Sequence, residues 1–454
     1  MQTNKKIAKL FTHEGATAKH INAELMLRRS VMSCMLWENE FYEDGVSIAD
    51  RIKALVPQVD AAKVASIAVE ARTSMKLRHA PLWLCAALAK TGSLKVSTLD
   101  AVIQRADELP EFLSMYWKDG KCTISAQVKK GLARAFTKFD AYSLSKYNRD
   151  QAIKLRDVLF LCHAKPNSAE QAQIWKDLID GTLAPPDTWE SKMASGKSKK
   201  ETFTDLLKAK NLGGLALLRN LRNMAESGVD EHLITEGLST MRVDRILPFR
   251  FIAAARHAPQ WESIIESSLM RCLDGNRKFT GRTVLLVDVS GSMYCPMSAK
   301  SDMQRIDAAC GLGICCRELC DDIAVYSFSE KTCRVPDRRG FALRDAITGS
   351  QSHSGTYMGK AVHYINEKEK YDRLIVITDE QSFDPIPNPV GKGYMINVAS
   401  NKNGVGYGAW THLDGFSEAV LSWISEFESS EEASEREYIA SLIQNRLNQQ
   451  LNQQ

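Results

Sequence analysis

Long apolar runs are absent from this 454-residue sequence. No uninterrupted apolar stretch approaches the ~20 residues that a helix needs to cross a membrane. The opening residues also lack the apolar core and small-residue cleavage site of a secretory signal. We therefore expect a cytoplasmic protein with no membrane partner. Hydrophobic residues make up 44% and charged residues 25% of the chain, as is usual for globular proteins, and its length indicates two or more domains.

Cysteine pairs with the spacing of a zinc site are also absent. The chain has 11 cysteines, an odd number, and no two of them form a Cys-x-x-Cys pair. Cys310, Cys315, Cys316 and Cys320 fall on one predicted helix, but their spacing does not match a zinc site. We expect buried, reduced thiols.

The most informative segment is TVLLVDVSGSM, residues 283–293. A buried-strand pattern brings Asp288, Ser290 and Ser292 to one short loop, and alternate residues of an extended segment share a face. One carboxylate and two hydroxyls form an all-oxygen ligand set, which favours Mg²⁺ or Mn²⁺ over zinc.

Two further pieces follow in order. HSGTYMG, residues 353–359, places Thr356 in a glycine-containing loop, and LIVITDEQS, residues 374–382, is a second buried strand that ends in Asp379. Together the pieces resemble the metal-ion-dependent adhesion site of von Willebrand factor A domains. The resemblance implies that Ser290 and Ser292 ligate the metal, that Thr356 joins them directly or through water, and that Asp288 and Asp379 hold waters and orient hydroxyls. The alternative is that these hydroxyls cap helices.

The surrounding pattern predicts a doubly wound α/β domain over residues 280–427, with the three motif pieces at the carboxyl ends of strands. The expected strands are 283–289, 323–329, 374–378 and 394–399, and the expected helices are 302–320, 357–369 and 415–427. No nucleophile and base accompany the motif, so we expect recognition and not catalysis.

Residues 1–275 show apolar spacing typical of helices and almost no strand signal. Many helices with short connectors predict paired-helix repeats stacked into a solenoid, although no clear sequence period is present. Residues 196–203 are polar and Lys-rich, which predicts a loop. Residues 428–454 form a polar, Gln-rich tail that is a docked helix, a partner-binding helix or a disordered end.

Charge is divided unequally along the chain. Residues 281–454 contain 17 Lys/Arg and 23 Asp/Glu, a net charge of −6, whereas residues 1–280 contain 42 and 32, a net charge of +10. A basic amino-terminal part indicates an anionic partner, and nucleic acid is the commonest one.

Several phrases in the same order resemble the Ro ribonucleoproteins, whose helical part is called the TROVE module. They are EGATAKHI (14–21), LRRSVMSCMLWENEFYEDG (27–45), ARTSMKLRHAPLWL (71–84), VLFLCHAKP (158–166), LALLRNLRNM (215–224) and ILPFRFIAA (246–254), and the first three look like bacterial members. The resemblance implies a closed, all-α ring of HEAT-like helical repeats whose two ends are joined by the von Willebrand factor A domain. It also implies that small non-coding Y-like RNA binds the outer surface, that 3′ ends of misfolded RNA enter the central hole, and that an exoribonuclease is a further partner.

Candidate RNA-binding residues lie in two places. In residues 125–139 an apolar stripe of Val128, Leu132, Ala135 and Phe139 is opposed by a cationic stripe of Lys130, Arg134 and Lys138. This helix either contacts phosphates or presents an ordinary solvated face.

Lys146, Arg149, His163 and Lys165 fall near opposite ends of one predicted helix, and Lys146 and His163 stand at positions resembling RNA-contacting ones. His163 is alternatively a helix C-cap.

We therefore predict a non-catalytic RNA-binding ring that acts in RNA quality control and does not bind DNA. The alternative is a protein-interaction scaffold whose metal site binds an acidic residue of a partner.

Overall fold

The computed structural model describes most of the chain. The described residues are 10–11, 17–18, 23–32, 45–73, 75, 77–185, 191–192, 198–244, 246, 248–274, 278–297, 303–399, 408–415, 420–421, 423–425 and 427–428. The predicted tail falls outside these residues, apart from its first residue, Glu428.

The amino-terminal part is a succession of short helices that follows a two-stranded hairpin, β1 (Leu10–Phe11) and β2 (Thr17–Ala18). The helices are α1 (Ala23–Met32), α2 (Gly45–Leu55), α3 (Ala61–Thr73), α4 (His79–Lys90), α5 (Val96–Val102), α6 (Glu108–Tyr116), α7 (Ala126–Phe136), α8 (Ala141–Tyr147), α9 (Leu155–Cys162), α10 (Ala169–Asp180), α12 (Lys199–Lys208), α13 (Gly214–Glu226), α14 (Glu231–Thr240), α15 (Phe249–His257) and α16 (Glu262–Leu273). Among them α3 packs on α5 and α5 on α7, while α2 packs on α4 and α4 on α6, so paired helices stack as repeats.

Two predictions about this part are wrong, and side-chain caps explain why. The helix expected to carry Lys146 and His163 is in fact two helices, α8 and α9. Each has its own start, because Asp140 accepts from the Ser143 N–H at 2.7 Å and Asp157 accepts from the Lys154 N–H at 2.8 Å. Residues 196–203 are not simply a loop, because a reciprocal pair of bonds between Ser198 and Glu201 starts α12.

The carboxy-terminal part contains a mixed sheet of strand order β5-β4-β3-β6-β7-β8, in which only β5 is antiparallel to its neighbour. Its strands are β3 (Phe279–Asp288), β4 (Cys320–Phe328), β5 (Thr332–Arg334), β6 (Arg373–Thr378), β7 (Lys392–Asn397) and β8 (Trp410–Asp414). The helices are α17 (Arg305–Leu319), α18 (Gly340–Thr348) and α19 (Met358–Lys368). The four predicted strands are present, whereas β5, β8 and α18 were not predicted.

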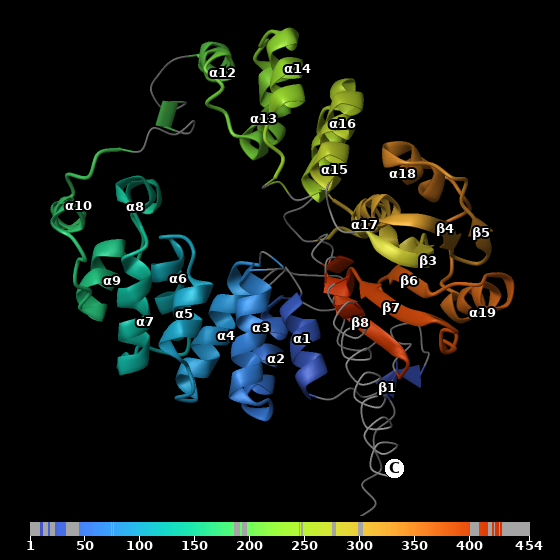
Figure 1. Cartoon of the computed structure of the whole chain (residues 1–454), viewed down its shortest axis with the longest axis horizontal. Coiled ribbons are helices and arrows are strands. Elements are labelled where there is room, and N and C mark those ends of the chain that lie inside the picture. The colour runs from blue at the N-terminus through green and yellow to red at the C-terminus, as the bar shows by residue number, and fades with distance from the viewer. Residues whose placement is uncertain are drawn as a thin grey trace, which may run out of the picture.

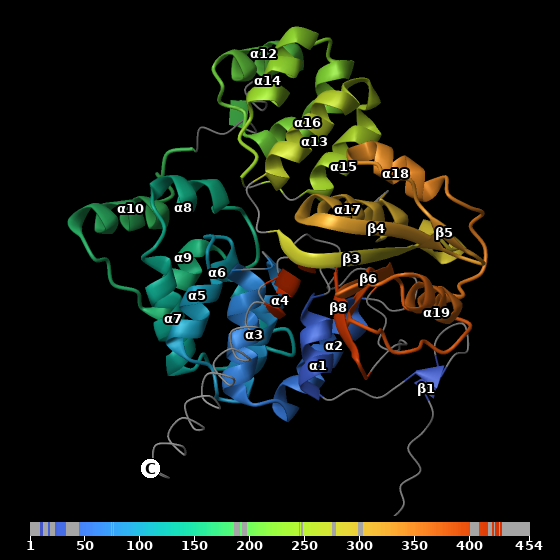
Figure 2. The same cartoon turned by 45° about the vertical axis from the view of Figure 1, so that its right-hand side comes forward.

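The sheet is buried on both faces. Alternate residues of β3 belong to different apolar clusters: Leu285 and Val287 lie in the cluster that contains α17, and Val284 and Leu286 lie in the one that contains α19. Figure 2 shows α17 and α18 on one side of the strands and α19 on the other. The predicted doubly wound arrangement is therefore confirmed.

The α/β domain contacts both ends of the helical array and completes a ring (Figure 1). At one end α1 packs against β8, and the Arg28 guanidinium lies 5.4 Å from the centre of the Trp423 ring. At the other end α15 and α16 pack against α17 and α18. There Glu266 accepts a hydrogen bond from the Phe341 N–H at 2.5 Å, at the start of α18, so a carboxylate of one part caps a helix of the other.

None of the helices that the structure describes is long and apolar enough to span a lipid bilayer.

Candidate metal centre and cationic helix surface

The first motif loop begins where β3 ends. Asp288 is fully buried and accepts hydrogen bonds from the Ser290 N–H at 2.9 Å and from the Thr378 hydroxyl at 2.7 Å. These bonds fix the carboxylate between the ends of β3 and β6. The hydroxyl oxygens of Ser290 and Ser292 lie 3.4 Å apart, so the two serines expected to ligate a metal point to one place.

The other two motif loops are tied to this one by hydrogen bonds. The Gly291 N–H donates to the Ser354 carbonyl at 3.1 Å, which holds the loop of Thr356 against the first loop. The Phe383 N–H donates to the Thr356 carbonyl at 3.0 Å, which connects that loop to the segment after Asp379. Thr356 itself is 4% exposed. The structure thus brings the predicted motif pieces together at the carboxyl end of the sheet.

Asp288 and Asp379 are buried here beside the cation of Arg305, and Glu380, which follows Asp379 in the chain, is buried as well. Burial, and then the charge of nearby Asp379, raise the pKa of Asp288 to about 7. Arg305, the first residue of α17, is 2% exposed, and its Nη1 lies 3.3 Å from Oδ2 of Asp379. Arg305 was not predicted as a site residue, since no pattern in the sequence indicates that this charged residue faces inward.

The donors gathered here are hydroxyls and carboxylates, which are oxygen ligands of the kind that Mg²⁺ accepts. The described residues contain no group of three or more His, Cys, Asp or Glu side chains arranged for a metal, so an ion here would depend on hydroxyls and water. Ser290, Ser292 and Thr356 supply hydroxyls, and Asp288 and Asp379 supply negative charge. Such a hydroxyl-rich, water-assisted set suits Mg²⁺ better than zinc.

Both predicted stripes of residues 125–139 are present, on α7 and the turn that follows it. Val128, Leu132, Ala135 and Phe139 are buried, and Lys130 and Arg134 are exposed. Two of the three cations are partly neutralised, because Asp100 lies 2.9 Å from Arg134 Nε and 3.1 Å from Lys138 Nζ. Lys138 Nζ also donates to the Ile103 carbonyl at 2.5 Å, so this lysine joins helices as well as carrying charge.

The second candidate group follows α8 and α9. Lys146, near the end of α8, is half-buried and lies 5.6 Å from the Tyr142 ring centre, while Arg149 and Lys165 are exposed. His163 is the C-cap of α9 with φ of 53°, as the alternative interpretation held, yet its side chain remains exposed. The split between α8 and α9 therefore places these residues on two helix ends instead of one helix.

An aromatic residue missed in the sequence lies beside His163. Phe160 on α9 is 57% exposed and borders a groove of about 370 Å³ that His163 and Trp175 also line. An exposed ring next to cationic groups is a surface on which a nucleic-acid base can stack.

The molecule is thus a ring of helical repeats completed by an α/β domain. No family model matches the chain, and no curated protein sequence matches it either. Among solved structures it matches the crystal structure of the Ro (RSR) protein of Deinococcus radiodurans. The match has a TM-score of 0.60 and 19% identity and covers 87% of this chain and 97% of that one. At this identity the match shows a shared fold, and it includes the ring and the α/β domain together.

Proposed function

We propose that this protein is a Ro-type, non-catalytic RNA-binding ring that acts in cytoplasmic RNA quality control and ribonucleoprotein assembly. The observation that carries the proposal is the structural match across nearly the full length of a Ro protein. The phrases of residues 14–254 that resemble the family support it independently, because they come from the sequence alone.

In this proposal basic side chains on and beside α7, α8 and α9 bind the phosphates of a small structured Y-like RNA. Lys130, Arg134, Lys146, Arg149, His163 and Lys165 are the contacts, and Lys138 contributes less because it is held by Asp100 and Ile103. The 3′ ends of misfolded RNAs occupy the middle of the ring, and an exoribonuclease acts on RNA that the ring presents. Phosphate contacts of this kind weaken steeply as salt rises.

The metal motif has a separate role in the proposal. Ser290, Ser292 and Thr356 would hold Mg²⁺, or Mn²⁺, with Asp288 and Asp379 orienting the hydroxyls and waters around it. A bound ion would offer a coordination position to a carboxylate of a partner protein. The protein's own residues bury and orient the donors through the Thr378 and Ser290 hydrogen bonds to Asp288.

The test is binding of a structured RNA with a single-stranded 3′ tail, measured over a range of salt concentrations. The parent is compared with a quadruple alanine variant at Lys130, Arg134, Lys146 and His163. We expect weaker binding and a salt slope that falls by about one for each lost phosphate contact. The matched control replaces four exposed cations of the α/β domain with alanine: Lys278, Lys331, Arg338 and Lys370.

Equal binding by the quadruple variant and its control would reject these residues as the RNA surface. A parent protein that binds no RNA would reject the function and favour the scaffold alternative, in which the metal site binds an acidic residue and the helices bind protein.

A further inference from the structure

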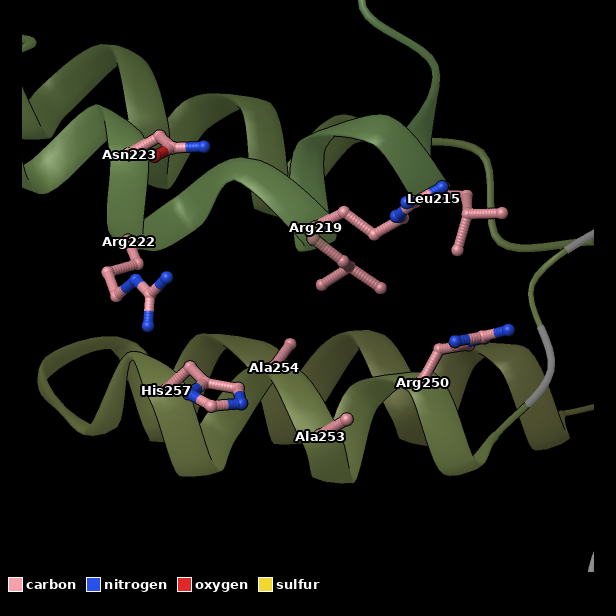
Figure 3. A pocket seen from close by; sticks show the side chains of 9 residues that line it. Leu215, Arg219, Arg222, Asn223, Arg250, Ala253, Ala254 and His257 are labelled. Carbon is pink, nitrogen blue, oxygen red and sulfur yellow. The ribbon is translucent and has the colours of Figure 1, made fainter. Parts of the chain in front are cut away.

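A cleft of about 260 Å³ lies between α13 and α15, away from the α7–α9 surface. Figure 3 shows Arg219 and Arg222 on α13 and Arg250 and His257 on α15, placed along the space between the two helices. The two basic residues of each helix are spaced so that they lie on the same face of that helix, and this face borders the cleft. Between the basic residues α15 presents only the methyl groups of Ala253 and Ala254, which leave the space open.

The lining of this cleft contains no acidic residue. Arg222 has a distant, exposed partner in Glu226 at 3.7 Å. For Arg219 and Arg250, the structure gives no carboxylate partner among the residues it describes. Burial, and then the charge of Arg219, lower the pKa of Arg250, although its side chain keeps contact with solvent. Like charges gathered at one place are unfavourable unless an anion joins them.

The geometry fits one kind of anion. Arginine guanidinium groups offer paired N–H donors that match two oxygens of a phosphate. Since a water molecule occupies about 30 Å³ in the liquid, the cleft has room for a phosphate group with some of its waters. Double-stranded RNA is stiff and holds its phosphates in a fixed helical array, whereas a single strand can bend to place one phosphate after another between two helices.

We propose that the cleft between α13 and α15 binds phosphodiester groups of a single-stranded segment of RNA. This inference rests on the RNA-binding function proposed above, and it assigns to the α12–α16 part of the ring a contact separate from Lys130, Arg134, Lys146 and His163. Leu215, which is 38% exposed at the same cleft, offers an apolar contact for a base or sugar next to the bound phosphate.

The test uses the full chain and a labelled oligouridine, which forms no duplex. The double variant Arg219→Gln/Arg250→Gln is expected to bind it at least roughly tenfold more weakly at low salt. The slope of log affinity against log salt should become shallower by about 0.7 for each lost phosphate contact. The control, Lys331→Gln/Arg338→Gln, removes the same charge from exposed positions of the α/β domain and should bind as the parent does.

Two further measurements separate the outcomes. Arg219→Lys/Arg250→Lys keeps both charges and should retain most of the affinity, with an unchanged melting temperature showing that the fold is intact. If the Gln variant binds oligouridine as tightly as the parent does, the proposal is overturned. The proposal is also overturned if inorganic phosphate stabilises the parent but not the Gln variant while both bind oligouridine equally. The cleft would then be a site for free anions. A parent that binds neither structured RNA nor oligouridine instead marks failure of the RNA-binding function itself.

Discussion

The candidate metal centre of the α/β domain and the candidate RNA surfaces of the helical array hold their charged groups in opposite ways. Asp288, Asp379 and Arg305 are buried at the strand ends, each held by hydrogen bonds or an ion pair. By contrast Lys130 of α7 and Arg219 of α13 stand on exposed helix faces. A buried group has one position and suits a small ion, whereas exposed cations on successive helices form an adaptable surface that suits a long polyanion.

Arg305→Met tests the buried side of the comparison most severely. Removal of one partner of a buried ion pair costs about 3–5 kcal/mol, so we expect a clear fall in melting temperature without metal. Mg²⁺ should raise the melting temperature of the variant more than that of the parent, since it replaces the lost positive charge near Asp379. Arg317→Met on the same helix is the control, and equal melting of the two variants would show that Arg305 does not neutralise the site.

Asp288→Asn tests the metal site directly. A ligand at 100 times its Kd stabilises the folded state by about 2.7 kcal/mol, so Mg²⁺ should raise the melting temperature of the parent by several degrees. The amide keeps the shape of the carboxylate and removes its charge, and the Mg²⁺-dependent rise should disappear. Asp337→Asn, an exposed position of the same domain, should retain it; a Mg²⁺ response that survives in Asp288→Asn contradicts the proposed site.

Gly340→Ala tests the joint between the two parts. Gly340 has φ of +55°, and an added Cβ would clash with Glu266 Oε1, the group that caps α18. The left-handed conformation alone costs about 1–2 kcal/mol for a residue with a side chain, and loss of the cap adds to this. We expect a lower melting temperature. Gly349→Ala, at the other end of α18 with φ of −87°, is the control and should melt close to the parent.

Lys130→Ala and Lys138→Ala should separate the contribution of surface charge to RNA binding from the contribution of packing to stability. We expect the smallest effects from these two variants. Lys130 is free to contact phosphate, so its loss should reduce the salt slope of RNA binding by about one and leave stability unchanged. Lys138 is held by Asp100 and Ile103, so its loss should lower stability by less than about 1 kcal/mol and barely change RNA binding. The reverse pattern would refute this division.

The same contrast explains how much the sequence predicts. The motif of Asp288, Ser290 and Ser292 is contiguous, and the carboxyl ends of parallel strands necessarily meet, so local spacing predicts which side chains come together. Asp379 follows from the same rule because it comes directly after β6, whereas Thr356 lies in the loop between α18 and α19 and was found only through the motif. Arg305 does not, because the side of a helix on which a charged residue lies depends on packing that local spacing does not contain.

In the helical array, the errors arise where caps override apolar spacing. Residues 148–154 contain neither proline nor glycine, so nothing in the spacing separates α8 from α9. Ser198 and Glu201 did carry a start signal for α12, but the surrounding lysines favoured the interpretation as a loop. The cleft between α13 and α15 is a tertiary feature, because its two cationic faces come from segments separated by the whole of α14.

The joint between α1 and β8 connects segments from near the two ends of the chain. During synthesis α1 leaves the ribosome long before β8 exists, so its docking face must wait for nearly all of the remaining chain to be translated. Contacts of such long sequence separation form late in folding. Premature termination before residue 410 therefore leaves the α1 end of the array without its strand partner, even if the helical repeats have already folded.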